Sequence, residues 1–287
     1  MNLSNARYVY GLATTAAATS INVTGDFTIG IDQTSASLTS ATSAYSLGGV
    51  IYGSGNSATI TVSTGATTGT TFVTGNAQVE TATAAGSVTG TGNASVVFTS
   101  AAVTGSPVTI SVAVTSGDSA ATWAGKVRTA LAANTAIAAA FDISGATTAI
   151  IVTRKSATIL ASAPVSYYSN DATLNISLDN GTCTGITTAA SSANTTAGVA
   201  TSGAYIIDGD GKDFEGTTLP TITAAYSLLI QCTSGDITPA TTNFKSKMPS
   251  GGTTLVGCAT AVSALLDTLV ITANSSNSSF TLTVLGS

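Results

Sequence analysis

Short stretches in which apolar and polar residues alternate occur along most of this chain, and they predict β-strands. Residues 58–63 (Ala-Thr-Ile-Thr-Val-Ser) are an example, because such alternation places one face of a strand in a core and the other in solvent. Thr and Val are typical of pleated surfaces, whereas Gly, Asn and Ser mark the turns between strands. Further strands are predicted at 20–24, 94–100, 108–115, 149–154, 173–178, 204–207, 226–232, 253–258, 269–272 and 279–285.

One segment, about 118–140, departs from this alternation and predicts an amphipathic helix. Trp123, Val127 and Leu131 recur every four residues, and Ala130 lies beside them on the same apolar stripe. Such a stripe is stabilised when it packs on another apolar surface. We therefore expect this helix to lie across a sheet, with Trp123 as an anchor in the core.

The ends and the polar face of this helix can also be predicted. Asp118 or Ser119 can accept a hydrogen bond from a free backbone N–H of the first turn. Lys126 and Arg128 lie off the apolar stripe and are expected to face solvent. The pair Asn134-Thr135 indicates a break before the last apolar turn.

Two compact units are expected from the length of the chain. It has 287 residues, and a domain commonly contains about 100–150. The strands and the helix together predict a mainly β fold with a minor α+β part. We expect a β-sandwich-like domain and a module in which one amphipathic helix packs on a sheet.

The hydropathy of the chain does not predict a membrane protein. Its mean hydropathy of +0.41 comes largely from small Ala and Val residues, and no segment supplies the roughly 20 consecutive apolar residues of a spanning helix. Residues 8–18 are only weakly apolar and lack a Leu-rich core. The N-terminus is therefore interpreted as that of a mature protein rather than as a signal peptide.

Charged residues are rare and histidine is absent, which argues against catalysis. Only 7% of the residues are Asp, Glu, Lys or Arg, and none lies between Asp32 and Glu80. General acid–base chemistry depends on such side chains, so we expect a structural or binding protein with no catalytic residues and no cofactor. The net charge of −5 disfavours nucleic-acid binding, which needs clustered Lys and Arg. The pair Arg154-Lys155 is interpreted as a solvated strand end.

The densest charge cluster contains the candidates for metal ligands, which are Asp208, Asp210, Asp213 and Glu215. Carboxylate oxygens in a glycine-containing loop are typical of calcium sites. Lys212, however, stands where an EF-hand spacing would need a ligand. We therefore expect a solvated acidic turn rather than a metal site.

The three cysteines, Cys183, Cys232 and Cys258, match neither a zinc pattern nor a redox CxxC. Their neighbours are small or apolar, which predicts buried free thiols. A disulfide between Cys232 and Cys258 is the alternative.

A group of sequence strings between residues 77 and 199 forms a specific pattern. It begins with VTGSPVTISVAV at 103–114, GDS at 117–119 and AGKVRTAL at 124–131, and it continues with VTRK at 152–155, NDATLNI at 170–176, NGTCTGI at 180–186 and TTAGV at 195–199. This pattern resembles a module of structural proteins of tailed bacteriophages, where it is attached to virion proteins of several kinds. One departure is the stretch 159–169, which is longer than the link expected there and leaves room for extra contacts.

The position of this module predicts how the chain is divided. We expect an inserted α+β module at 76–199, with 1–75 and 200–287 together forming a discontinuous β-rich domain. Insertion is tolerated at exposed turns whose ends lie close together, and the β-like segments 70–74 and 204–207 would then be neighbouring strands. Three β domains in series are the alternative.

The resemblance implies a structural protein of a phage virion, in first place a capsid decoration or cement protein that stabilises the head shell. It would lie on the outer surface of the head after synthesis in the host cytoplasm. Its partners would be the major capsid protein and other copies of itself, in a homo-oligomer such as a trimer. Surfaces rich in Ser and Thr suit such contacts because they cost little to desolvate.

Two alternatives to head decoration stay open. One is a tail protein, as a component of the tube, a tube-decorating protein or a fibre. The other is an adhesin that binds a receptor or a carbohydrate. In an adhesin, those of Tyr45, Tyr52, Tyr167 and Tyr168 that are exposed are the candidates for stacking on a sugar ring.

Overall fold

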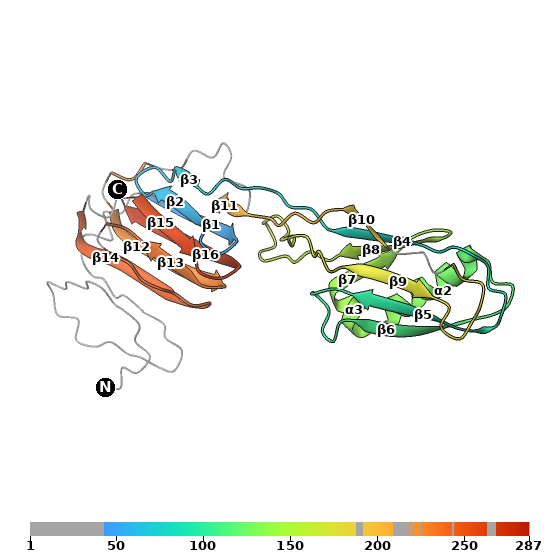
Figure 1. Cartoon of the computed structure of the whole chain (residues 1–287). Coiled ribbons are helices and arrows are strands. Elements are labelled where there is room, and N and C mark those ends of the chain that lie inside the picture. Colours follow the sequence, from blue (N-terminus) through green and yellow to red (C-terminus); the bar gives the residue numbers. More distant parts are fainter. Residues whose placement is uncertain are drawn as a thin grey trace, which may run out of the picture. The chain divides into compact units, whose positions relative to one another are not determined.

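The computed structural model describes residues 43–187, 192–208, 219, 221–223, 225–242, 244–262 and 268–286. The fold is mainly β, with 49% of the described residues in strands and 9% in helices, as the sequence predicts. The predicted strand at 20–24 lies outside the described residues. The chain forms two compact units (Figure 1): unit 1 contains Met1–Val73, Thr158–Pro164 and Ser202–Ser287, and unit 2 contains Thr74–Ala157 and Val165–Thr201.

Unit 1 contains two antiparallel sheets. The five-stranded sheet has the order β11 (Gly203–Asp208), β1 (Ser43–Tyr52), β16 (Asn277–Gly286), β12 (Ala225–Ser234) and β14 (Thr253–Val262). The four-stranded sheet has the order β13 (Ile237–Ala240), β15 (Thr268–Ala273), β2 (Ser57–Thr61) and β3 (Thr67–Gly69). Buried side chains of both sheets, among them Leu47, Ile60, Leu228, Ile271 and Phe280, form one core, which is the arrangement of a β-sandwich.

Unit 2 combines two smaller antiparallel sheets with the helices. One sheet has the order β10 (Ala193–Thr196), β4 (Val79–Thr83), β8 (Ala149–Arg154) and β7 (Phe141–Ser144). The other has the order β6 (Val108–Val114), β5 (Gly92–Thr99) and β9 (Asn175–Asp179). Helix α2 (Ala120–Ala133) contacts β6, β7 and β8, so it covers strands of both sheets rather than one.

The predicted apolar stripe and N-terminal cap of the helix are both confirmed. Trp123, Val127 and Leu131 are fully buried in the core of unit 2, and the indole Nε1 of Trp123 donates to the carbonyl of Gly86 at 3.0 Å. Ser119 caps α2 by accepting a hydrogen bond from the backbone N–H of Thr122. The predicted helical segment is divided into two helices, α2 and the short α3 (Thr135–Ala140).

The break between the helices lies at the predicted position. Asn134 ends α2, and its side-chain Oδ1 accepts from the backbone N–H groups of Ala136 and Ile137 at the start of α3. A side-chain oxygen in this position satisfies donors that have no partner within the helix. The chain can therefore turn between α2 and α3 without leaving these N–H groups unpaired.

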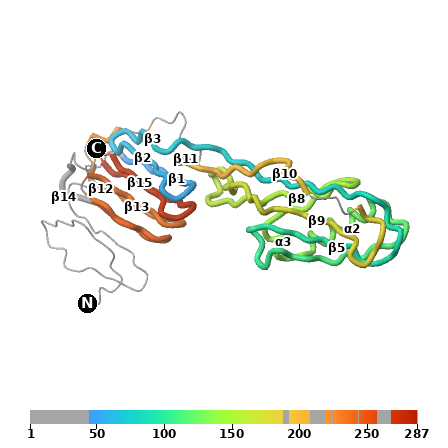
Figure 2. The backbone as a smooth tube through the Cα atoms, viewed as in Figure 1, coloured from blue at the N-terminus to red at the C-terminus, as the bar shows by residue number. Residues whose placement is uncertain are grey.

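The segments at the junction of the two units run antiparallel to one another. Val73 forms a β-bridge with Ser202, and Asn76 forms one with Val199. Figure 2 shows these segments side by side, the first in cyan and the second in orange. Ala204 also donates its N–H to the carbonyl of Thr70 at 3.0 Å, so the flanks 70–74 and 204–207 are neighbours.

One segment differs from the expected division. Thr158–Pro164, which the sequence assigned to the module at 76–199, belongs to unit 1. There the phenol of Tyr52 donates a hydrogen bond to the carbonyl of Pro164 at 2.5 Å. The stretch 159–169, which is longer than the phage-like pattern requires, thus supplies a contact within unit 1.

Candidate functional site

A pocket of about 390 Å³ in unit 2 brings together cationic, aromatic and hydroxyl groups. Its wall comes from four places: the turn after β5, helix α3, the end of β8 and the loop that contains Tyr168. These segments are distant in the sequence and meet because β8 ends beside the C-terminal end of α3. The lining residues are Ala102, Thr104, Ala136, Ala139, Ala140, Arg154, Lys155, Ser156 and Tyr168.

Arg154 contacts two aromatic rings. Its guanidinium carbon lies 5.1 Å from the ring centre of Phe141 and 4.5 Å from that of Tyr168. Both distances are within the range of cation–π contacts. In the described part of the chain no carboxylate lies within 4 Å of this guanidinium, and its one hydrogen bond there is a long one, 3.4 Å from Nη1 to the carbonyl of Ala140. Most of its five N–H donors are therefore available to a ligand.

Lys155 provides a second positive charge at the same wall. Its Nζ donates to the carbonyl of Ala138 at 2.6 Å and lies 3.5 Å from Oδ1 of Asp142. Ala138 belongs to the last turn of α3, where carbonyls without a helical partner attract cations. The ammonium is thus fixed at the rim of the pocket, and Asp142 balances part of its charge.

The remaining wall is small and uncharged. Ala102 and the alanines of α3 keep the pocket open, because their methyl groups occupy little of its volume. Thr104 and Ser156 are exposed and contribute hydroxyl groups. Tyr168 is 43% exposed and contributes an aromatic surface. This arrangement can bind a small anion that also carries an apolar face and hydroxyl groups.

Sequence reasoning missed this site. It interpreted Arg154-Lys155 as a solvated strand end, whereas both side chains are partly buried and make contacts. A signal that could have found it is the nearby pair Tyr167-Tyr168 in a loop that departs from the phage-like pattern. The folding that brings α3 to the end of β8 could not be read from local sequence.

The four tyrosines proposed for sugar stacking are not equivalent. Tyr45 is 5% exposed and Tyr52 is fully buried, so these two do not meet the condition of exposure and neither can stack on a ligand. Tyr45 donates to the carbonyl of Val62 at 2.6 Å, and burial raises its pKa above the usual value. Tyr167 is partly buried. Tyr168 is thus the one of the four that exposes a large part of its ring.

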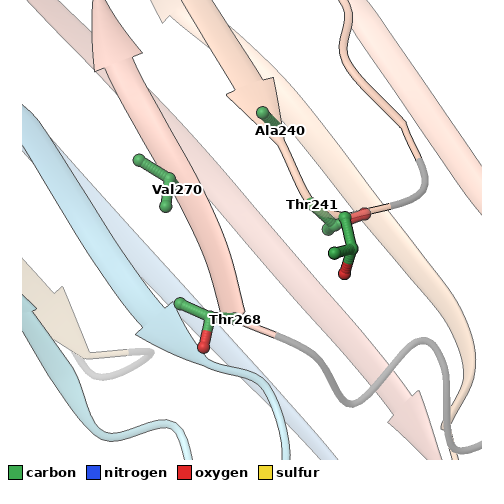
Figure 3. Close-up of a pocket in the computed structure, with 5 residues that line it drawn as sticks. Ala240, Thr241, Thr268 and Val270 are labelled. Atoms are coloured by element: carbon green, nitrogen blue, oxygen red, sulfur yellow. The ribbon is translucent and has the colours of Figure 1, made fainter.

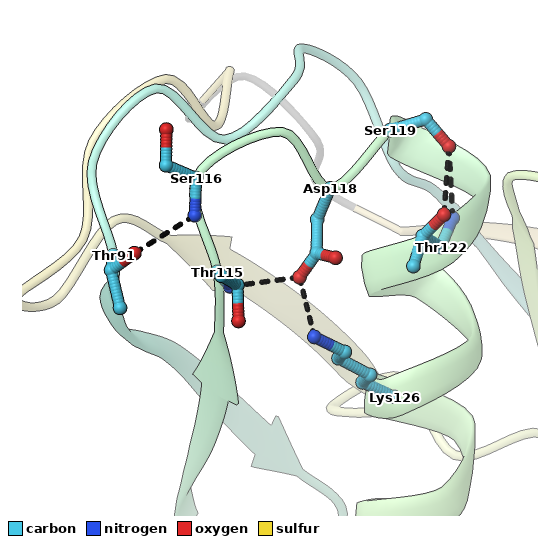
Figure 4. A network of polar contacts seen from close by, with 7 residues as sticks. All are labelled: Thr91, Thr115, Ser116, Asp118, Ser119, Thr122 and Lys126. Atoms are coloured by element: carbon cyan, nitrogen blue, oxygen red, sulfur yellow. Dashed lines mark hydrogen bonds and ion pairs between the residues drawn. The ribbon is translucent and has the colours of Figure 1, made fainter.

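Asp118 and Lys126 form a structural cluster rather than a ligand site (Figure 4). Oδ2 of Asp118 accepts from the backbone N–H of Thr115 at 2.8 Å and from Nζ of Lys126 at 2.5 Å. The hydrogen bond from Lys126, followed by that from Thr115, lowers the pKa of Asp118. These bonds join the turn after β6 to α2.

The expectation that Lys126 and Arg128 face solvent is therefore wrong in part. Lys126 is paired, and Nη1 of Arg128 donates to the carbonyl of Ala149 at 2.6 Å and to that of Thr147 at 3.2 Å. Thr147 has φ +46, in the left-handed region that costs energy for a residue other than glycine. Arg128 thus helps to hold the turn between β7 and β8. Long side chains off an apolar stripe can reach backbone carbonyls of neighbouring elements, which periodicity alone does not show.

The four carboxylates proposed as metal ligands cannot be assembled into a site. Asp208 ends β11, but its side chain, and Asp210, Asp213 and Glu215 entirely, lie outside the described residues. Their expected role as a solvated acidic turn stays a prediction. Among the residues that the structure does describe, no three His, Cys, Asp or Glu side chains are grouped closely enough to hold a metal ion.

The cysteine prediction is confirmed for two of the three residues. Cys183 and Cys232 are buried free thiols, so the alternative disulfide is not formed at Cys232. Burial raises the pKa of both thiols, which favours the less reactive protonated form. The side chain of Cys258 lies outside the described residues.

A second pocket, of about 370 Å³, lies in unit 1 and carries no charge (Figure 3). Ala240 of β13 and Val270 of β15 pair across the sheet at its wall, and Thr241, Thr242 and Thr268 complete the lining. A lining of methyl and hydroxyl groups alone provides little basis for binding one ligand in preference to another. The pocket beside Arg154 is therefore the stronger candidate.

Comparisons with protein-family models, with curated proteins and with solved structures find no match to this chain. None of the helices in the described ranges is long and apolar enough to cross a membrane.

Proposed function

We propose that this protein is a non-enzymatic structural component of a tailed-phage virion, specifically a decoration or cement protein on the outer surface of the head. The phage-like strings between residues 77 and 199 support this from the sequence. The observation that carries the proposal in the structure is an exposed, uncharged sheet face in unit 1. Such a face suits a lasting contact with the major capsid protein.

This face is the outer side of β12, β14 and β16, opposite the core. Leu229 of β12 is 40% exposed, although its neighbours Leu228 and Ile230 are fully buried. It pairs directly with the partly buried Leu255 of β14 on one side and with Thr283 of β16 on the other. None of the residues of β12, β14 and β16 is charged.

An uncharged sheet face can associate with another protein at low desolvation cost. Burying an unpaired charge is expensive, whereas burying Leu and the methyl groups of Thr is favourable by about 25 cal/mol per Å² of apolar area. On a capsid the same contact would be repeated many times and reinforced by contacts between copies of the protein. We therefore place the protein in a homo-oligomer on the shell, and a trimer is the specific form that we propose.

The test compares phage particles that lack the protein with normal particles under heat and low salt, where packaged DNA stresses the shell. Heads that assemble normally but burst earlier support cementing. Heads that are equally robust, together with absent or short tails, would assign the protein to the tail instead. Particles with intact heads and tails that fail to adsorb to cells would favour an adhesin.

The contact face is tested by adding purified variants back to particles that lack the protein. Leu229→Lys places a charge on the face and should abolish binding to heads. Thr109→Lys is the matched control, because it adds the same charge at an exposed position of β6 in unit 2. Equal binding of the two variants would show that this face does not contact the shell.

A further inference from the structure

We infer that the pocket beside Arg154 binds an acidic sugar, a pyranose that carries one carboxylate. The inference does not depend on the position of the protein in a virion, because it rests on the pocket alone. It concerns the groups that line the pocket in unit 2, which are Arg154, Lys155, Tyr168, Thr104 and Ser156.

Arg154 is suited to a carboxylate by both charge and shape. A guanidinium presents parallel N–H groups that match the two oxygens of a carboxylate. The rings of Phe141 and Tyr168 limit the movement of this plane, so less side-chain entropy is lost when a ligand binds. An arginine held by aromatic contacts, with no carboxylate partner among the described residues, is thus prepared for one from outside.

The charge balance of the pocket selects a monoanion. Arg154 and Lys155 each carry one positive charge, and Asp142, at 3.5 Å from Lys155, offsets one of them. The remaining excess is one positive charge, which one carboxylate neutralises. The whole chain has a net charge of −5, which repels polyanions such as nucleic acids.

The uncharged part of the pocket fits the rest of a sugar. A volume of about 390 Å³ is near the lower end of the roughly 300–1,000 Å³ typical of ligand pockets, which suits one small ring. Tyr168 and the methyl groups of Ala136 and Ala139 offer an apolar surface for the C–H groups of that ring. The hydroxyls of Thr104 and Ser156 can exchange hydrogen bonds with the hydroxyls of the sugar.

The test measures binding of glucuronic acid to the full chain by ligand-observed NMR and calorimetry. Glucose is the neutral control, and inorganic phosphate is the control for an anion without a sugar ring. We expect saturable binding of glucuronic acid that is at least tenfold stronger than that of glucose or phosphate. Equal binding of glucose would show that the pocket does not recognise the carboxylate. Equal binding of phosphate would show that it is a general anion site and does not recognise the sugar ring. Either result would overturn the inference.

Variants locate the binding to this pocket. Arg154→Ala should weaken binding of glucuronic acid at least tenfold, and Arg154→Lys should weaken it several-fold because the charge stays while the paired N–H groups are lost. Lys247→Ala is the matched control, since it removes the same charge from an exposed position in unit 1. Unchanged binding by Arg154→Ala, or equal loss in Lys247→Ala, would overturn the assignment.

A blocking variant separates loss of binding from loss of folding. Ala139 is exposed on α3 and lines the pocket, so Ala139→Phe should fill the space while both cations remain in place. We expect this variant to unfold at the same urea concentration as the wild type and to lose binding of glucuronic acid. Retained binding in a folded Ala139→Phe protein would show that the sugar binds elsewhere.

Discussion

The backbone of Gly49 lies directly against the ring of Phe280. The two residues pair across β1 and β16, and a Cβ atom placed on Gly49 would come within 2.6 Å of Cε1 of that ring. Phe280 is fully buried in the core of unit 1. Its ring thus occupies the space that a side chain of residue 49 would need, so a larger residue at this position would displace the ring or the strand.

Gly49→Ala should therefore destabilise unit 1 by about 1–3 kcal/mol, the usual cost of overpacking a core. Gly48→Ala is the matched control, because the nearest atom to a Cβ there is the carbonyl oxygen of Phe280 at 3.6 Å, an ordinary contact. We expect Gly48→Ala to change the free energy of unfolding little. Urea denaturation measures both, and equal effects of the two substitutions would contradict the packing account.

Trp123→Ala should cost about 3–5 kcal/mol, the range for truncating a large buried aromatic residue. The side chain is fully buried, and the indole N–H is bonded to the carbonyl of Gly86. Trp123→Phe should lose less, because it keeps much of the apolar volume and gives up the hydrogen bond. A loss below about 1 kcal/mol for Trp123→Ala in urea unfolding would mean that the residue is not a core anchor.

The helix could be predicted because its signals are local. The four-residue spacing of Trp123, Val127 and Leu131, the cap at Ser119 and the break at Asn134 all lie within one short segment. The pocket depends instead on the meeting of α3, the end of β8 and the loop around Tyr168. Contacts between distant segments depend on the whole fold, so the sequence indicated neither the pairing of Arg154 with Tyr168 nor the space beside them.

Strand β1 shows a second reason why prediction from local sequence fails. Val50, Ile51 and Tyr52 are consecutive and all fully buried, so both faces of β1 are covered at this end, with the ring of Phe72 packed 5.8 Å from that of Tyr52. Alternation is the signal of a strand with one solvated face, so a strand buried on both faces does not show it. The pair Gly48-Gly49 further weakens the strand pattern.

Asp118 should make the stability of unit 2 sensitive to acid. Its hydrogen bonds with Lys126 and Thr115 lower its pKa in the folded state, so the unfolded chain binds a proton more readily. The stabilisation is therefore present above the unfolded pKa of about 3.9 and is lost as the pH falls through the lower folded value. In urea unfolding, we expect the wild type to exceed Asp118→Asn in stability near neutral pH and this difference to shrink in acid.

Lys126→Met tests the cause of this acid sensitivity. The hydrogen bond from Lys126 is the largest contribution to the low pKa of Asp118, so removing the ammonium should raise that pKa toward the ordinary value. The stability of the variant should then fall less than that of the wild type between neutral and acidic pH. The same slope in both proteins would show that Lys126 does not stabilise the ionised carboxylate.

Tyr52 should make the stability of unit 1 sensitive to alkali. Burial, with a smaller effect of Tyr205 nearby, raises its pKa to about 12, from the usual value of about 10. A raised pKa means that the stabilisation is complete below the unfolded value and is lost as the pH rises toward 12. At neutral pH, Tyr52→Phe should cost about 0.5–1.5 kcal/mol, because the carbonyl of Pro164 loses its hydrogen bond.

Measurements at alkaline pH distinguish the ionisation of Tyr52 from that of the other tyrosines. Tyr52→Phe has no phenol to ionise at this position, so its stability should fall less steeply than that of the wild type above about pH 10. Tyr45 is also buried with a raised pKa and remains in the variant, so some of the fall should persist. Urea unfolding across this range, with tyrosinate absorbance recorded in parallel, measures both effects. Identical slopes for the two proteins would mean that Tyr52 ionises as freely in the folded state as in the unfolded chain, and that its burial does not oppose ionisation.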